Sequence, residues 1–310
     1  MISLSQELSE ETRLHVEFKI ESLRKLQRSA VTMFSYDLVV AHRIIFGPQD
    51  FFKNCTNHLN PAAIPLSEAT RLLFNRCGGL ILVREILEAA TNDKVSGLSS
   101  EQADFVTRNL AKAQLALGDA VLAFLGKYHW SVKERRLRMA RLTDPAERRI
   151  SDLNRIPNLV DIAEHHLVGV EFKLQPRLES KPIDKFRAAH TELSRLAADL
   201  WLFLENKRLN KQFASPQDYA FDSANKYPKT LSIKNYLLNL RTFGPRGALD
   251  RMGKRYPRER LLNSFPLLLW NGEVSREPDV RRHLQQQLKS QARDWAGFVA
   301  DYKSIWPAYG

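Results

Sequence analysis

The sequence predicts a mainly α-helical protein, a multi-helix bundle that follows a short α/β segment at the N-terminus. Beyond about residue 60, apolar side chains recur at the spacing of three or four residues that is typical of amphipathic helices. Arg13–Ile20 (RLHVEFKI) instead alternates apolar and polar residues, as a half-buried strand does. The predicted division is therefore residues 1–52 for the α/β segment and residues 53–310 for the helical part, with a subdivision near residue 145 left open.

The N-terminal segment contains two further predicted elements. Ser22–Arg28 is expected to form a short basic helix or a loop. Phe34–Phe46 (FSYDLVVAHRIIF) resumes an apolar pattern before the terminator Gly47-Pro48, and is predicted as a helix with a strand as the alternative. Because both edges of a strand need hydrogen-bond partners, Arg13–Ile20 requires either a hairpin-like remnant nearby or a larger sheet that once continued upstream.

The helical part is predicted to begin at Pro65, because proline favours the first turn of a helix. Two long helices follow, over Leu66–Ala90 and from Ser99 toward Lys127, where Ser99 offers a cap. A short connection joins these helices, so they are expected to be antiparallel neighbours. The remaining predicted helices are Ser131–Arg141, Ile156–Gln175, Asp184–Arg208, Ser232–Phe243, Pro257–Leu269 and Pro278–Ile305.

The composition is that of an ordinary globular chain, with 44% hydrophobic and 26% charged residues among 310. Its two cysteines, Cys55 and Cys77, have no metal-ligand spacing. The N-terminus is acidic and lacks the apolar core of a signal peptide, and no apolar run is long enough to span a bilayer. A cytoplasmic protein with no membrane partner is expected, and the oligomeric state is left open.

The formal net charge of +12 suits a polyanionic partner, either nucleotide phosphates or nucleic acid. Two segments concentrate the positive charge. Lys133–Arg155 carries eight Lys/Arg against four Asp/Glu, and Arg241–Arg260 carries seven against two. A solvated basic surface without a ligand is the alternative interpretation of each segment.

Polar groups interrupt the apolar helix within Leu115–Arg138 and define the first candidate site. Asp119 lies two turns before Lys127, so both can project from one face, and Tyr128 follows directly. Burying a carboxylate or an ammonium costs several kcal/mol unless the group is paired or bound to a ligand. Asp119, Lys127 and Tyr128 are therefore candidate ligand-binding residues.

A polar row on Leu66–Ala90 supplies a second set of candidates. Its members are spaced i, i+3, i+7 and i+11, and one further cation lies beside them. The row consists of Glu68, Arg71, Asn75 and Gly79, with Arg76 as the neighbouring cation. Because a helical glycine costs about 1 kcal/mol relative to alanine, Gly78-Gly79 predicts close helix packing or backbone exposed to a ligand.

Two interpretations of these polar groups stay open at the level of sequence. In the first, they line a groove for a ligand. In the second, Glu68–Arg71 and Asp119 with Arg76 or Lys127 are buried ion pairs that serve packing specificity alone.

No familiar catalytic or metal-binding motif occurs in the chain. Gly-rich phosphate loops, G-x-S-x-G, H-E-x-x-H and C-x-x-C are all absent from the sequence. His165 and His166 are adjacent and diverge by about 100° on a helix, so they are predicted to be a surface or groove pair. No metal site is predicted.

Two helical segments together resemble a known arrangement. IPLSEATRLLFNRCGGLIL (Ile64–Leu82) and AKAQLALGDAVLAFLGKYHWSVKER (Ala111–Arg135) are similar to the helical region after the catalytic domain in nucleotidyltransferase-like proteins of the polymerase-beta superfamily. HVEFKI (His15–Ile20) resembles the strand that carries the third metal-binding carboxylate of that domain, and FSYDLVVAHRIIFG (Phe34–Gly47) resembles its closing helix and strand. The resemblance covers about residues 13–140, and makes residues 1–52 a remnant of the catalytic domain.

The resemblance implies transfer of a nucleotidyl group from a nucleoside triphosphate, with Mg²⁺ as cofactor, where a complete catalytic domain is present. The chain departs from that pattern, because it contains no Gly-Ser dipeptide and no Asp-x-Asp or Asp-x-Glu pair. Glu17 matches the third carboxylate, but one carboxylate cannot hold two metal ions. A truncated or degenerate homologue is therefore expected, inactive as it stands and with no cofactor of its own.

The resemblance also implies roles for the candidate residues. Lys127 would contact phosphates as a point charge, and Tyr128 would stack or hydrogen-bond. Arg71, Asn75 and Arg76 would line the same groove. The alternative function is a non-catalytic helical binding module for nucleic acid or protein.

Overall fold

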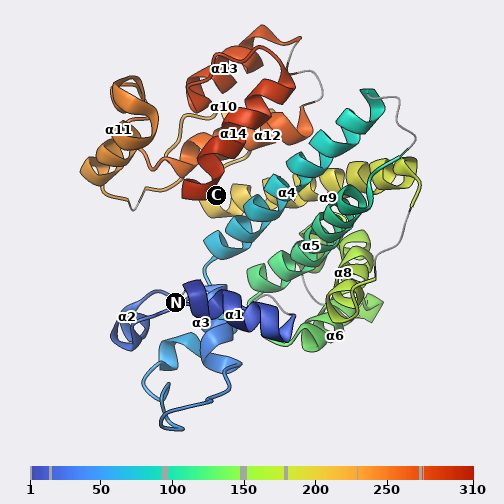
Figure 1. The fold of residues 1–310 in the computed structure, drawn as a ribbon, viewed down its shortest axis with the longest axis vertical. Coiled ribbons are helices and arrows are strands. Elements are labelled where there is room, and N and C mark those ends of the chain that lie inside the picture. The colour runs from blue at the N-terminus through green and yellow to red at the C-terminus, as the bar shows by residue number, and fades with distance from the viewer. Residues whose placement is uncertain are drawn as a thin grey trace.

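The computed structural model consists of helices and the loops that connect them, the longest described loop region lying between α3 and α4 (Figure 1). It describes residues 2–13, 16–92, 97–146, 152–177, 181–228, 230–271, 274 and 276–310. Across these residues no strand is formed, so the prediction of a mainly α-helical bundle is confirmed. None of the helices in these ranges is long and apolar enough to cross a membrane.

The helices follow one another along the chain with few irregular stretches. Their bounds are α1 Ile2–Thr12, α2 Leu23–Arg28, α3 Met33–Val40, α4 Leu66–Asn92, α5 Ser100–Phe124, α6 Val132–Leu142, α8 Leu159–Leu174, α9 Ile183–Leu209, α10 Pro216–Phe221, α11 Ser232–Ala248, α12 Arg258–Trp270, α13 Pro278–Leu288 and α14 Trp295–Tyr309. Short 3₁₀ turns lie at Thr56–His58, Pro61–Ala63 and Asp152–Arg155.

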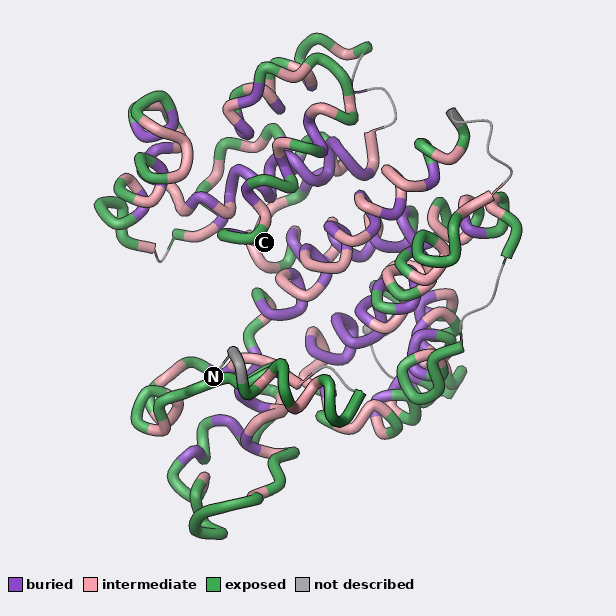
Figure 2. Tube along the Cα trace, in the orientation of Figure 1, coloured by how far each residue is buried: buried purple, intermediate pink, exposed green. Residues whose placement is uncertain are grey.

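Helix α5 forms the centre of the first group of helices and packs against α4, α6, α8 and α9 (Figure 1). It begins with a capping box, in which Ser99 accepts from the Gln102 amide and the Gln102 side chain accepts from the Ser99 amide. Its second half is buried almost without interruption, as the purple tube of Figure 2 shows. The expected neighbours α4 and α5 do pack side by side, because the connection between them is short.

Helix α12 is the centre of the second group. Every residue from Glu259 to Leu269 is buried, and α10, α13 and α14 pack around it. It also contacts α4 and α9, so the two groups share one continuous hydrophobic core. Helix α8 packs on α5 and α6, and the first group therefore continues past residue 145.

The glycine pair of α4 allows close packing, as the sequence predicts. A Cβ on Gly78 would lie 2.7 Å from the Trp306 ring, and one on Gly79 would lie 2.7 Å from Oδ1 of Asn109. Gly78 therefore admits the indole of α14, and Gly79 admits a side chain of α5.

The predicted strand at Arg13–Ile20 is wrong for the part that the structure describes, since Val16–Ile20 is irregular. Leu14 and His15 lie outside the described residues. The alternation does not correspond to burial, because Phe18 is 44% exposed and Ile20 is 73% exposed. Hydroxyl groups of α1 bond the Val16 backbone in place of a neighbouring strand, with the Val16 amide donating to Ser9 Oγ at 2.9 Å. The described part of residues 1–52 is therefore helical and irregular, without the β component expected of an α/β remnant.

Two other predicted helices have different bounds. The pattern over Phe34–Phe46 contains α3, which ends at Val40, and Phe46 is 99% exposed in the following loop. The predicted closing helix Pro278–Ile305 is two helices, because Lys289 is left-handed (φ 55°) and Asp294 caps a new start at α14. Leucine spacing alone did not reveal this break.

Candidate anion-binding site

A buried polar cluster lies where α3 and the α5–α6 connection meet α5, α6 and α8. We call it the junction cluster, and its members are Asp37, Asp119, Tyr128, Arg135 and His166. Asp119 and Arg135 are each only 4% exposed, and they form an ion pair through Nη1 and Oδ2. His166 Nε2 donates to the other oxygen of Asp119 at 3.1 Å, so one carboxylate holds two helices to α5.

Tyr128 connects this ion pair to the N-terminal segment. Its hydroxyl donates to Oδ2 of Asp37 at 3.1 Å, and Arg135 Nη1 lies 3.4 Å from the same hydroxyl. The Arg135 guanidinium also lies 5.1 Å from the centre of the Tyr128 ring, and Tyr36 contacts that ring edge-on. Tyr128 is therefore buried and hydrogen-bonded, and Arg135 and Tyr36 contact its ring.

A tight connection between α5 and α6 places Tyr128. Helix α5 ends at Phe124, and Gly126 adopts a left-handed conformation (φ 65°), so that the Lys127 amide donates back to the Leu122 carbonyl at 2.7 Å. A Cβ on Gly126 would be strained and would approach Ala62 to 3.1 Å. The chain therefore reverses immediately after α5 and turns Tyr128 inward.

Helix α6 fixes this connection from the other side. Arg138 Nη1 donates to the carbonyls of Lys127 at 3.0 Å and Tyr128 at 3.2 Å. The Ser131 side chain accepts from the Glu134 amide and so begins α6 one turn before Arg135. Arg135 thereby points back toward Asp119.

Burial shifts the pKa values of two members of the junction cluster, Asp37 and Tyr128. It raises the pKa of Asp37, against the opposing effects of the Tyr128 hydrogen bond and the Arg135 charge. It also raises the pKa of Tyr128, which therefore stays a neutral hydrogen-bond donor. The cluster thus contains one firmly paired carboxylate, Asp119, and one carboxylate, Asp37, whose ionised form is disfavoured.

Two cations border the junction cluster, Arg76 from α4 and Lys173 from α8, and we call them the cationic rim. Burial lowers the pKa of Arg76, and the charge of Asp119 partly restores it. Desolvation also lowers the pKa of Lys173, and the charges of Arg135 and Arg76 lower it further. Among the described residues, neither rim cation forms an ion pair, and the positive charges of Arg135 and Arg76 both act on Lys173.

Several buried polar atoms of this region have no hydrogen-bond partner within the described part of the chain. They are Asp37 Oδ1, Asn75 Oδ1, Arg135 Nε and His166 Nδ1. A buried polar atom without a partner costs about 1–3 kcal/mol, and a ligand that bonded these atoms would recover that free energy.

The predicted site residues separate into two groups. Asp119 and Tyr128 join the junction cluster, Arg76 joins the rim, and Asn75 adjoins Arg76 on α4 with its buried oxygen unpaired. In the alternative interpretation Asp119 is a buried ion-paired residue, and it is one in the structure, but its partner is Arg135 of α6 in place of Arg76 or Lys127.

The other predicted residues lie elsewhere. Arg71 pairs with Glu68 at 2.6 Å, as predicted, but it lines a small cavity with Trp201 and Arg208. Lys127 is exposed, because α5 ends at Phe124 and the two-turn spacing from Asp119 does not hold. Glu17 is exposed in the irregular stretch after α1.

Sequence reasoning missed four residues of the site, namely Asp37, Arg135, His166 and Lys173. Asp37 carried the same signal as Asp119, a single carboxylate within an apolar run. His166 was predicted at a surface or groove, whereas it is 1% exposed against α5. Arg135 and Lys173 carried no distinguishing signal in a chain with 47 Lys/Arg residues.

A cavity of about 510 Å³ lies apart from this site, between α4, α9 and α12. Arg84 and Arg187 line it and are held by backbone carbonyls, the first by Leu268 at 3.1 Å and the second by Leu87 at 3.4 Å. None of the residues predicted from sequence lines this cavity.

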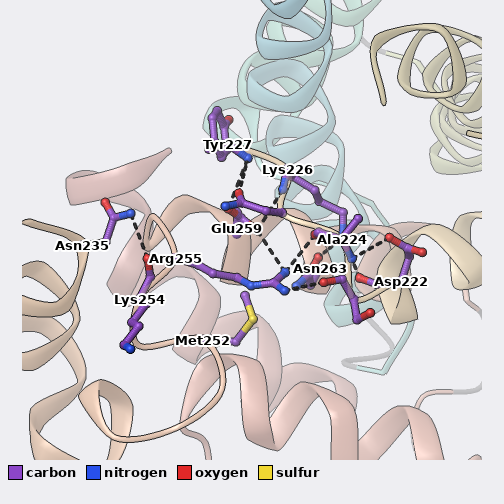
Figure 3. Close-up of polar contacts among 12 residues, drawn as sticks. Asp222, Ala224, Lys226, Tyr227, Asn235, Met252, Lys254, Arg255, Glu259 and Asn263 are labelled. Carbon is purple, nitrogen blue, oxygen red and sulfur yellow. Dashed lines mark hydrogen bonds and ion pairs between the residues drawn. The ribbon is translucent and has the colours of Figure 1, made fainter. Parts of the chain in front are cut away.

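A second buried network surrounds the start of α12 (Figure 3). Glu259 is fully buried, and its carboxylate accepts from the amides of Lys226 at 3.1 Å and Tyr227 at 3.2 Å. The fully buried Lys226 ammonium donates to Asn263 Oδ1 and to the Asp222 carbonyl. We call this set, together with Arg255 and Arg260, the α12 network.

The described residues contain no group of three or more His, Cys, Asp or Glu side chains placed to hold a metal ion.

Comparisons of the chain with protein-family models, with curated proteins and with solved structures gave no match.

Proposed function

We propose that the junction cluster and its cationic rim bind the phosphate groups of a nucleotide, without a catalytic step of their own. The observation that carries this proposal is the convergence of Arg76, Arg135 and Lys173 from three helices, with Asp119 ion-paired to Arg135 alone among the three. Charged donors held close together repel one another, and an anion with several oxygens relieves that repulsion.

The residues of the site would have two kinds of role, contact with the phosphate and positioning of Arg135. Arg76 and Lys173 would contact phosphate oxygens directly, because both are free of ion pairs with described residues and both lie at the edge of the cluster. Asp119 and Tyr128 would position Arg135, which donates to the first and lies beside the second. Tyr128 would therefore orient the site rather than stack on a base.

A nucleotide is the proposed anion because Ile64–Leu82 and Ala111–Arg135 resemble the helical region of nucleotidyltransferase-like proteins. Arg76 and Asp119 lie within those two stretches. Nucleic-acid binding is the rival function, and it would draw on the wider basic surface rather than on two rim cations.

Titration calorimetry with ATP tests the proposal. Arg76→Gln and Lys173→Gln are each expected to weaken binding about tenfold, since each removes one charge-assisted contact. Lys112→Gln, on an exposed position of α5, provides a matched control with the same change in net charge and is expected to bind as wild type does.

A single-stranded oligonucleotide should be titrated beside ATP at two salt concentrations. Tight oligonucleotide binding with a steep salt dependence, unaffected by Arg76→Gln, would establish the rival function. Equal ATP affinities in wild type and both rim variants, or no ATP binding by any of them, would remove the phosphate role.

A further inference from the structure

Helix α11 turns its apolar side chains outward and its amide side chains inward. Ile233, Leu237 and Leu240 recur at i, i+4 and i+7 and are 72%, 58% and 39% exposed. We call these three residues the α11 stripe. Asn235 and Asn239 on the opposite face are only 2% and 0% exposed. Surface helices ordinarily show the reverse arrangement, with the apolar face toward the core.

Buried hydrogen bonds hold α11 in this orientation. Asn239 Nδ2 donates to the carbonyls of Gly253 at 3.1 Å and Arg255 at 2.8 Å, and its Oδ1 accepts from Arg260 Nε at 3.0 Å. Asn235 Nδ2 donates to another carbonyl of the same loop at 3.1 Å. Rotating the stripe inward would break these bonds and leave buried polar groups without partners. The outward stripe is therefore a fixed feature of the fold.

The charged residues of α11 are all positive. Lys234 and Arg241 are exposed on the same helical run as the stripe, and Arg246 is exposed beyond the kink at Gly244 (φ 66°). No aspartate or glutamate occurs between Ser223 and Leu249. Helix α11 also stands at the edge of the molecule, on the left of Figure 1, where a flat surface can reach it.

We propose that α11 docks on the surface of an anionic lipid bilayer. The stripe would enter the boundary between headgroups and acyl chains, and the cations would meet the anionic headgroups. Leu231, which precedes the helix, and Leu249, which follows the kink at Gly244, are also 69% and 76% exposed. The proposal does not depend on the phosphate site.

Charge and size favour a lipid surface over a protein partner. A second copy of the chain would bring the same cations and no carboxylate on α11, so the two helices would repel. A stable protein interface buries about 800 Å² on each side through roughly 20–30 residues, far more than one short helix offers. A basic amphipathic helix lying in the plane of a bilayer needs no complementary groove, and it need not span the membrane.

Cosedimentation with vesicles tests the proposal on the full chain. Vesicles of phosphatidylcholine and phosphatidylserine, in a ratio of about 7:3, are compared with pure phosphatidylcholine. Wild type is expected to bind the anionic vesicles at least about tenfold more strongly than the neutral ones. The double change Ile233→Gln with Leu237→Gln should lower binding at least about tenfold, because it removes apolar surface. Arg241→Gln should lower binding about fivefold.

Leu137→Gln provides the control, because Leu137 is 53% exposed on α6, a comparable exposure to that of Leu237. It is expected to bind vesicles as wild type does. Since the stripe is exposed, the midpoint of thermal unfolding should be the same in the double variant and in wild type. If the double variant is destabilised, Arg241→Gln still tests the proposal independently.

Three outcomes would overturn the proposal. The first is the absence of wild-type binding to anionic vesicles, and the second is equal vesicle binding by wild type and both sets of variants. The third is that the chain does not bind vesicles but self-associates or forms a protein complex that depends on the stripe. The stripe would then be a protein interface.

Discussion

The junction cluster and the α12 network both contain buried charged groups, but these groups differ in how completely they are hydrogen-bonded. In the α12 network, Arg260 is fully buried and donates to the Asn239 side chain, the Gly247 carbonyl and both oxygens of Asp250. In the junction cluster, Arg135 keeps Nε without a partner in the described structure. The difference teaches that burial of charge alone does not mark a binding site.

Backbone participation explains the contrast. Backbone groups complete the hydrogen bonding of the α12 network, such as the Lys226 and Tyr227 amides that donate to Glu259 (Figure 3). Because backbone groups are always present, these hydrogen bonds do not depend on a ligand. The junction cluster is built from side chains of five segments, and some of its donors and acceptors have no partner in the described structure. We therefore expect changes in the α12 network to alter stability, and changes at the rim to alter binding.

Arg260→Met should have the largest effect on stability. It leaves the buried Asn239 oxygen and the Gly247 carbonyl without their donor, and the free energy of unfolding should fall by about 3–5 kcal/mol. Urea denaturation measures this change. Arg282→Met, whose side chain is 69% exposed, serves as the control and should stay within about 0.5 kcal/mol of wild type. A loss below about 1 kcal/mol for Arg260→Met would contradict a closed structural network.

Lys226 should make stability depend on pH. Burial lowers its pKa from 10.5 to about 8, so the unfolded chain binds more protons than the folded protein between these values. The free energy of unfolding should therefore rise with pH across this window. Between pH 7.5 and 9.5 the contribution is about 2 kcal/mol.

Lys226→Met isolates that contribution, because other groups titrate equally in the variant and in wild type. Urea denaturation at the two pH values should show the rise in wild type and its absence in the variant. The same rise in both proteins would mean that Lys226 is not the group responsible.

Asp37→Asn should tighten nucleotide binding and change stability little. The variant removes a negative charge beside the phosphate site, so affinity for ATP should increase about threefold to tenfold. Because burial raises the pKa of Asp37 above 3.8, the folded protein holds this proton more firmly than the unfolded chain does. The free energy of unfolding of wild type should therefore fall as pH rises from 3.8 through the raised pKa of Asp37, and that of the variant should not. Weaker ATP binding by the variant would show that Asp37 supports the ligand.

Arg76→Gln should have the smallest effect on stability. Arg76 forms no ion pair with a described residue, so the free energy of unfolding should stay within about 0.5 kcal/mol of wild type. Thermal and urea unfolding measure this beside the binding titration. A large loss of stability would place Arg76 in a structural network like that of Arg260 and would contradict its proposed role as a phosphate-binding cation.

The sequence by itself determined where most helices lie. The spacing of apolar residues, the Ser99 cap and the proline before α4 are local signals, and each predicted an element that the structure contains. The same local signals misled at Arg13–Ile20, where alternation was present but no neighbouring strand was available in the described structure. They also missed the break at Lys289, since no residue pattern there forbade a continued helix.

Only the tertiary structure decided which polar residues meet. Asp119 was recognisable as a buried carboxylate, but its partners Arg135 and His166 come from α6 and α8, 16 and 47 residues further along the chain. The outward face of α11 was likewise decided by carbonyls of a later loop, which hold Asn235 and Asn239 inside. Helix formation depends on near neighbours in sequence, whereas ion pairs and exposed faces depend on how whole helices pack.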